Sequence, residues 1–140
     1  MKNCKILILS FLTISFFTGH SLAEVKHWNQ VDTDDLTQVE IKDKYRDLLV
    51  HNKAELNKTV SQCLEVINRD DDIMCNDLKQ DLTKAFLKSQ DDWDKLIESD
   101  KEVIEYDHCG GSGTEIFTLK YQIGKTIERI KELKERFCLK

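Results

Sequence analysis

The sequence IFTLKYQIGKTIERIKELKERF, residues 116–137, decides the fold class. Apolar side chains recur in it every three or four residues, with charged residues between them. The apolar set is Ile116, Leu119, Ile123, Ile127, Ile130, Leu133 and Phe137. This spacing places them on one face of an α-helix. The stretch Gly110-Gly111-Ser112-Gly113, just before it, is the clearest turn in the chain.

A second helix is predicted over residues 36–67, where apolar positions again recur at helical spacing. Thr33 or Asp34 would cap its first turn, since both side chains accept hydrogen bonds from free backbone N–H groups. The stretch at residues 51–52 leaves open whether this is one helix or two. The aspartate-rich stretch at residues 68–72 predicts the next turn.

The longest predicted helix runs from about Ile73 to Tyr106, with Phe86, Trp93 and Ile97 on its apolar stripe. At 1.5 Å per residue it would be roughly 50 Å long, and a helix of that length needs an apolar partner to be stable. We expect the last helix to fold back against it, because a short loop makes two helices antiparallel neighbours. The fold class is therefore all-α: a small antiparallel up-and-down bundle of three to four helices around one long central helix.

Composition agrees with this fold class. The chain has 140 residues, which suits one domain, and it contains five glycines and no proline. Sheet proteins need many turns, and turns depend on those two residue types. The net charge of −5 argues against a nucleic-acid-binding protein, which would carry a basic surface.

Residues 1–23 are predicted to be a secretory signal peptide. Lys2 and Lys5 precede an apolar run over residues 6–17, and Ser21-Leu22-Ala23 supplies the small residues of a cleavage site. The run is shorter than the roughly 20 residues of a membrane-spanning helix, so we expect no stable membrane insertion after cleavage. Residues 24–33 would then form a flexible arm and residues 34–140 the helical domain, in the periplasm or outside a bacterial cell.

Cleavage after Ala23 leaves 26 acidic and 19 basic residues, a net charge of −7. It also leaves four cysteines, and an even number in an exported chain predicts disulfides. Cys63 and Cys75 flank the predicted turn at similar distances, so they would face each other in a helical hairpin and are the favoured pair. The pairing of Cys109 and Cys138 stays open, because a straight helix would separate them by roughly 35 Å.

Three stretches carry a family resemblance. They are Glu55-Leu56-Asn57-Lys58, then Ser89-Gln90-Asp91-Asp92-Trp93, and then Gly110-Gly111-Ser112 followed by Thr126-Ile127-Glu128-Arg129-Ile130-Lys131-Glu132-Leu133. In order, spacing and helical setting they resemble the LprI-like lysozyme-inhibitor family of exported bacterial proteins. The matching motif residues are Gln90, Trp93, Gly110, Gly111 and Arg129. The family's usual bridge, which would fall near Val103 and Lys120 or Tyr121, is absent here.

The resemblance implies a helical binding protein that occludes a basic lysozyme. Clustered acidic residues, at 70–72 and at 91–94, fit a cationic partner, because such a surface raises the rate of encounter. The alternatives are a cell-envelope binding or scaffolding module and a toxin-immunity protein with another partner. The residues that contact the partner are not predicted by the sequence.

Neither an enzyme nor a cofactor site is predicted. His27, His51 and His108 are widely spaced and no Gly-x-Ser-x-Gly nucleophile motif accompanies them. The glycine cluster lacks the lysine of a phosphate-binding loop, and residues 70–72 lack the spacing of a calcium loop. We therefore expect no catalytic residue, no cofactor and no metal.

Three side chains have expected structural roles. Trp93 is predicted to lie in the core, and Arg129 to pair across the bundle with an acid such as Asp94 or Glu98. Trp28, in the polar arm, either docks back on the bundle or contacts a partner.

Overall fold

A computed structural model describes residues 25–69, 76–111, 113–137 and 139. These residues form a short 3-10 helix, η1 (Trp28–Gln30), and three α-helices: α1 (Gln38–Arg69), α2 (Asn76–Asp107) and α3 (Thr114–Arg136). The described residues contain no strand, so the all-α prediction is confirmed, with three helices. None of these helices combines the length and the apolar character that crossing a membrane requires.

Helix α1 is continuous through residues 51–52, so the stretch that the sequence left open is one helix of 32 residues. It begins at Gln38, later than predicted, because Thr37 and Glu40 form its cap. The Glu40 backbone N–H donates to Thr37 Oγ1 (3.3 Å), and the Thr37 backbone N–H donates to Glu40 Oε2 (2.8 Å). This reciprocal pair satisfies two free donors at the helix start, so the predicted cap at Thr33 or Asp34 is wrong.

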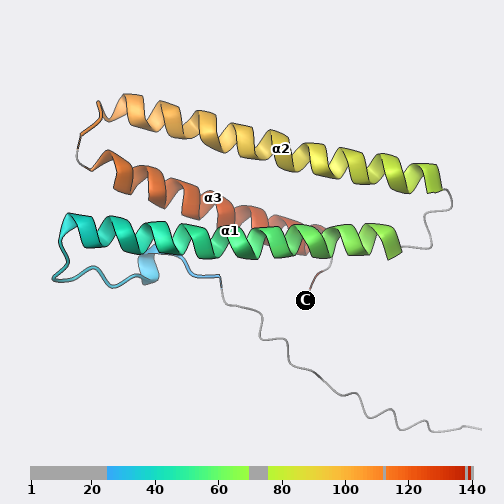
Figure 1. Cartoon of the computed structure of the whole chain (residues 1–140), viewed down its shortest axis with the longest axis horizontal. Coiled ribbons are helices and arrows are strands. Elements are labelled where there is room, and N and C mark those ends of the chain that lie inside the picture. Colours follow the sequence, from blue (N-terminus) through green and yellow to red (C-terminus); the bar gives the residue numbers. More distant parts are fainter. Residues whose placement is uncertain (1–24, 70–75, 112, 138, 140) are drawn as a thin grey trace, which may run out of the picture.

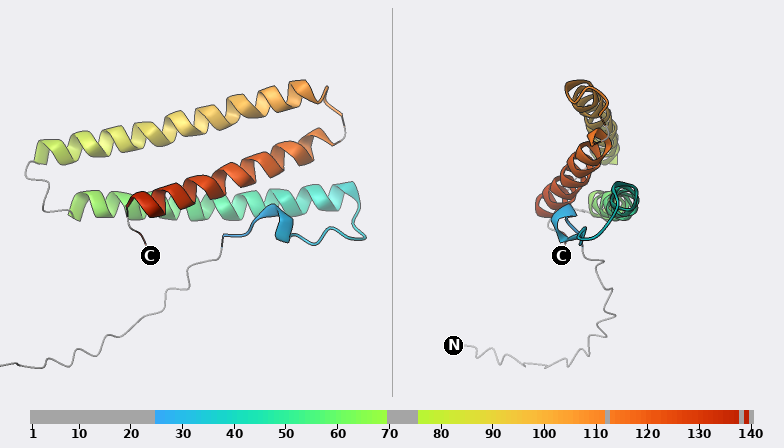
Figure 2. Two further views of the ribbon diagram at one scale, coloured as in Figure 1. Left: turned by 180° about the vertical axis from the view of Figure 1, so that it is seen from behind. Right: turned by 90° about the vertical axis from the view of Figure 1, so that its left-hand side faces the viewer.

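Helix α3 lies between α1 and α2 in Figures 1 and 2, and the direction of the chain alternates from one helix to the next. Helix α3 packs most extensively against α1, less against α2, and α1 and α2 touch only sparsely. Helix α3 therefore folds back against α2 as predicted, but its more extensive partner is α1. The expectation of a long central helix is corrected, because α3, the shortest of the three α-helices, lies between the other two (Figure 1).

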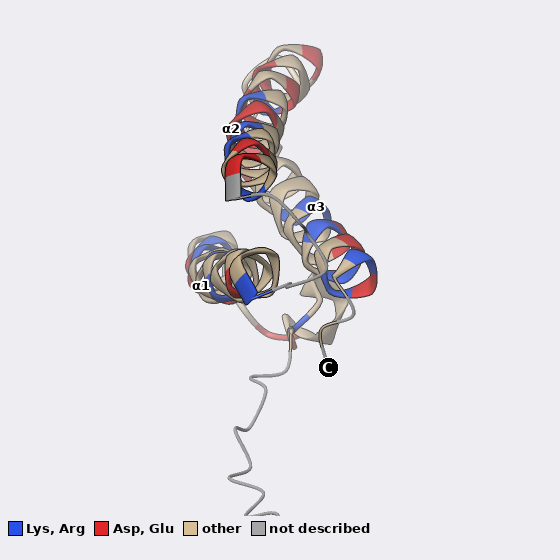
Figure 3. Ribbon diagram, turned by 90° about the vertical axis from the view of Figure 1, so that its right-hand side faces the viewer, with Lys and Arg blue, Asp and Glu red and all other residues tan. Residues whose placement is uncertain are grey.

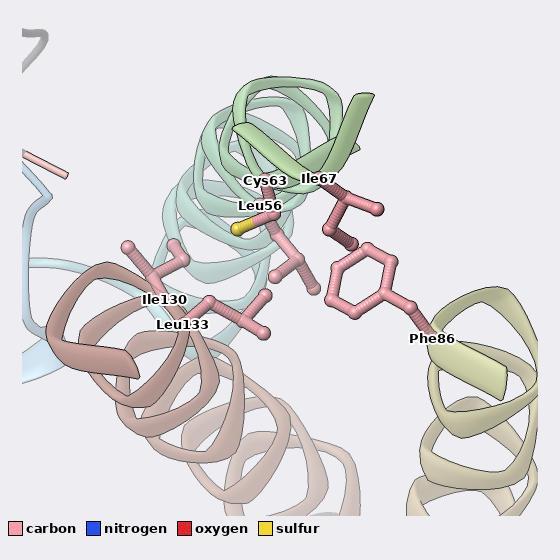
Figure 4. Close-up of a cluster of buried hydrophobic side chains, with 6 residues drawn as sticks. All are labelled: Leu56, Cys63, Ile67, Phe86, Ile130 and Leu133. Carbon is pink, nitrogen blue, oxygen red and sulfur yellow. The ribbon is translucent and has the colours of Figure 1, made fainter. Parts of the chain in front are cut away.

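Two apolar clusters explain why α1 is the main partner of α3. The buried members of the second apolar cluster come from α1 and α3 only: Tyr45, Leu48, Leu49, Leu119 and Ile123. The first apolar cluster contains Leu56, Cys63, Ile67, Ile130 and Leu133, and here α2 adds a single buried side chain, Phe86. Figure 4 shows the Phe86 ring reaching from α2 toward the side chains of α1 and α3.

The apolar stripe of α2 is mostly uncovered. Phe86 and Ile97 are its buried members. The exposed members are Leu78 (58%), Leu82 (40%), Leu96 (56%) and Val103 (66%). The sequence predicted an apolar partner along the whole helix, and no described residue covers this part of it.

The glycine cluster lies at the predicted turn, between the end of α2 and the start of α3. Gly110 has φ +65° and Cys109 has φ +53°. The left-handed region suits glycine and costs other residues roughly 1–2 kcal/mol. The Gly110 N–H donates to the carbonyl of Glu105 (3.3 Å), which satisfies one carbonyl at the end of α2.

The arm before α1 returns along the bundle. Lys120 Nζ lies 4.7 Å from the centre of the Trp28 ring, and Trp28 packs against the second apolar cluster. The Asn52 side-chain amide, which is fully buried, donates to the carbonyl of Lys26 (2.9 Å). Trp28 therefore docks back on the bundle, while the flexibility of residues 24–33 stays a prediction.

Candidate functional site

The three motif stretches meet at one cleft between the helices. Helix α1 contributes Leu56 and Asn57, α2 contributes Gln90 and Trp93, and α3 contributes Thr126. The cleft has a volume of about 450 Å³, within the ordinary range for binding sites. It lies between α1 and α2, with residues of α3 at its floor. We call it the motif cleft; its other lining residues are Lys53, Val60, Asp94, Ile97, Glu98 and Gln122.

Arg129 joins two of the motifs directly. Its Nε donates to Gln90 Oε1 (3.2 Å), its Nη2 donates to Ser89 Oγ (3.0 Å), and its Nη1 donates to Glu132 Oε2 (2.7 Å). The Arg129 residue is only 8% exposed. A buried guanidinium with acceptors on three sides fixes the position of α2 relative to α3.

The predicted partners of Arg129 are therefore wrong. It pairs across the bundle with the neutral side chains of Ser89 and Gln90, and with an acid of its own helix, rather than with Asp94 or Glu98. The cause is the register between α2 and α3, which places Arg129 level with Ser89 and Gln90. Asp94 and Glu98 lie further along α2, on the wall of the motif cleft.

The polar groups of the motif cleft are incompletely paired. Gln122 on its floor is 8% exposed, and its side-chain amide has no hydrogen-bond partner among the described residues. Asp94 on the α2 wall and Lys53 on the α1 wall form no ion pair with any described residue. Glu98 accepts from Lys101 Nζ (2.6 Å). The Gln122 amide is not among the buried unpaired polar groups of the described residues, which are at His51, Asn52 and Thr114. It reaches the space of the cleft, where it can form a hydrogen bond with a polar or cationic group.

Trp93 is half-buried at the boundary between two hollows. It packs against the first apolar cluster and lines the motif cleft on one side of α2. On the other side it lines a hollow of about 460 Å³ together with Asp100 and Tyr121. The Tyr121 hydroxyl donates to Asp100 Oδ2. Desolvation by burial, and then this bond, raise the pKa of Tyr121 to about 12.

One exposed face of α2 carries a row of carboxylates, which we call the acidic ridge: Asp91, Asp94, Glu98, Glu102 and Glu105. Residues 91–107 contain eight acidic and two basic residues, and Figure 3 shows acidic positions in red along α2 toward its C-terminal end. Asp91 pairs with Lys95 (2.5 Å). Asp94, Glu102 and Glu105 have no ion-pair partner among the described residues, so their charge is available to a partner.

The remaining predicted residues lie elsewhere. Gly110 and Gly111 are at the α2–α3 turn and do not line the motif cleft. Cys63 is fully buried in the first apolar cluster, Cys109 is exposed, and neither forms a disulfide with another described residue. Cys75 and Cys138 lie outside the described residues, as does the aspartate run at 70–72. The Cys63–Cys75 bridge therefore stays a prediction.

Sequence reasoning missed Lys53 and Gln122. Gln122 stands four residues before Thr126 and seven before Arg129, which places all three on one side of α3. A polar row beside an apolar stripe could have identified it. Lys53 had no comparable pattern. Within the part of the chain that the structure describes, no group of three or more His, Cys, Asp or Glu side chains could hold a metal ion.

The fold and the site define a small all-helical protein with a polar cleft bordered by acidic residues. The family model described as lysozyme inhibitor LprI matches residues 29–133, so the chain belongs to this family. The matched region starts within the predicted arm and includes all three motif stretches. No curated protein and no solved structure matches the chain.

Proposed function

We propose that the protein binds a basic lysozyme and inhibits it by covering the acidic cleft where lysozyme holds its substrate. The observation that carries this proposal is membership of the lysozyme-inhibitor family over residues 29–133. The family and the apparent leader peptide together support export to the periplasm or the exterior of a bacterial cell. Inhibition by occlusion requires no catalytic step from this chain.

The acidic ridge is the surface best suited to a basic partner. Carboxylates near the C-terminal end of a helix lie at the negative end of its dipole, where they weaken the helix. Glu105 and Asp107 are near the end of α2, and the last turn of this helix contains no basic residue. Their charge therefore does not stabilise the helix itself and is available to attract a cationic partner.

Asp94 and Glu98 connect the ridge to the motif cleft, because they belong to the ridge and also line the cleft. A lysine or arginine side chain of the partner that entered the cleft would meet both carboxylates. The unpaired amide of Gln122 would lie at the floor. We propose these three residues as the centre of the contact.

The test is a titration of a basic animal-type lysozyme with the chain from Glu24 onward, at two salt concentrations. Two quantities are measured: the dissociation constant of the complex and the rate at which lysozyme lyses cell walls. The triple variant Asp94→Asn, Glu98→Gln, Glu102→Gln should weaken binding by about ten-fold, since each exposed charge pair contributes ~0.2–1 kcal/mol. The control is Asp34→Asn, Asp47→Asn, Glu65→Gln, three exposed acids outside α2.

Higher salt should weaken binding by the unchanged chain more than binding by the triple variant. Unchanged lysis at excess protein contradicts the proposed function. Inhibition that the triple variant and the control lose equally contradicts the choice of surface but not inhibition itself. Specific capture of a different envelope protein would favour the scaffolding or immunity alternative.

A further inference from the structure

The exposed apolar residues of α2 form a regular strip. Positions 78, 82, 85, 89, 92, 96, 99 and 103 follow each other at alternating steps of four and three residues, which is the spacing of a helix–helix seam. The apolar members of this strip are Leu78, Leu82, Ala85, Leu96 and Val103. The four large ones are 40–66% exposed. We call this set the α2 strip.

We propose that the α2 strip packs against the α2 strip of a second copy of the chain, with the two helices antiparallel. An interface between identical surfaces around a two-fold axis requires that the strip be complementary to itself. If Leu78 lies opposite Val103 of the second copy, the same register places Leu82 opposite Ser99 and Ala85 opposite Leu96. Large side chains then face smaller ones at these three levels, and every pair occurs twice.

The charge distribution of α2 selects the antiparallel direction. Residues 76–90 contain three lysines and two aspartates, a net charge of +1, whereas residues 91–107 have a net charge of −6. A parallel pair would place the two acidic halves side by side. An antiparallel pair places each acidic half beside the basic half of the other helix, which favours this arrangement at low salt.

The charge in the middle of the strip is compensated within one chain. The centre of the strip, Ser89 and Asp92, is polar, and Asp92 pairs with Lys88 (2.5 Å).

The strip also explains how α2 is stabilised. A helix of 32 residues that buries only Phe86 and Ile97 lacks apolar contact over most of its length. Covering the strip would remove large aliphatic side chains from water at several levels of the helix. The acidic residues Asp94, Glu98 and Glu105 are on a different side of α2, so both copies keep most of the ridge accessible.

The experiment measures the mass of the chain from Glu24 onward by sedimentation equilibrium over a range of concentrations at low salt, with and without reductant. Reductant is included because the exposed Cys109 could crosslink two chains. We expect a reversible dimer that persists under reduction and weakens as salt is added. A chain that stays monomeric at its highest soluble concentration overturns the proposal, as does a dimer that disappears completely under reduction.

Two leucines of the same helix provide a matched pair of variants. Leu96 is 56% exposed and in the strip, whereas Leu87 is 47% exposed and nine residues, two and a half turns, away on the opposite side of α2. Leu96→Glu should raise the dimer dissociation constant by about 100-fold, because it occurs twice in the interface. Leu87→Glu should leave that constant nearly unchanged. Equal effects of the two variants overturn the assignment to the strip.

A size exchange tests the direction and the register. Leu96→Ala and Ala85→Leu should each weaken the dimer, because they place two small or two large side chains opposite each other, and the double variant should restore it. Circular dichroism confirms that each variant keeps its helices. A double variant weaker than either single one overturns the antiparallel register. None of these outcomes depends on lysozyme binding, so failure of the dimer and failure of the proposed function are separate results.

Discussion

Arg129 of α3 donates a hydrogen bond from Nε to Oε1 of Gln90 of α2, over 3.2 Å, and so joins two residues 39 positions apart in the chain. Both belong to the stretches that carry the family resemblance. The bond lies beside the motif cleft, which Gln90 also lines. Arg129 is therefore a positioning residue that holds the α2 wall of the cleft on α3.

Replacement of Arg129 by Met should lower the free energy of unfolding by about 2–3 kcal/mol, since hydrogen bonds to a charged group contribute ~1.5–3 kcal/mol. Urea denaturation measures this loss. Lys131→Met is the control on the same helix, because Lys131 is exposed and its ion pair with Glu135 spans 3.8 Å. Equal losses in the two variants would mean that the Arg129 bonds do not hold α2 in place.

Phe86→Ala should have a larger effect on α2 than on the rest of the fold. Phe86 is the only side chain of α2 among the buried members of the first apolar cluster, and large-to-small changes of this kind cost roughly 3–5 kcal/mol. Hydrogen exchange should show α2 amides losing protection before those of α1 and α3. Leu87→Ala, at an exposed neighbouring position, should change protection little.

The bond between Tyr121 and Asp100 predicts a pH effect at the alkaline end. Burial and this bond raise the pKa of Tyr121 from 10.0 to about 12 in the folded protein. Between these values the unfolded chain loses the proton and the folded chain keeps it, so stability falls as pH rises from about 10 to 12. Tyr121→Phe should remove this part of the decline in denaturation curves, whereas Tyr106→Phe, at an 89% exposed site, should retain it.

The two described cysteines should react at very different rates in the reduced, folded protein. Cys109 is exposed, whereas Cys63 is fully buried and burial raises the pKa of its thiol. Because the thiolate is the reactive form, iodoacetamide should label Cys109 first and Cys63 only after denaturation. Equal labelling of both in the folded state would contradict the burial of Cys63.

Peptide mapping without reductant tests the predicted disulfide. We expect a linked pair of peptides that contains Cys63 and Cys75. The bond should protect Cys63 from alkylation even in denaturant, until a reductant is added. A linkage of Cys63 to Cys109 or Cys138 instead would refute the favoured pairing.

The sequence predicted the helices well because periodicity and turn residues are local properties. The apolar spacing of residues 116–137 and the glycine cluster before them place α3 correctly. The start of α1 was missed because two candidate caps, at Thr33 and Asp34, precede the Thr37–Glu40 pair that forms the cap. Periodicity identifies the apolar face of a helix. It does not show which of several polar residues before that face caps the first turn.

Packing between helices could not be predicted in the same way. The stripe of α2 shows which residues are apolar, but not whether α1, α3 or another chain covers them. The partner of Arg129 depends on the register of α3 against α2, which is set by the turn between them and by the crossing angle. The motif cleft depends on the packing registers of all three pairs of helices at once. The motifs therefore predicted some of its residues, but they did not predict that a cleft exists.

The central position of α3 has a consequence for how the protein matures. Helix α3, against which both other described helices pack, follows them in the chain, and residues such as Tyr45 and Ile123, which share a cluster, are far apart in sequence. Until α3 has emerged, α1 has little to bury itself against, and such distant contacts form slowly. The first two helices should therefore remain loosely packed until α3 is available, and the three should become compact together.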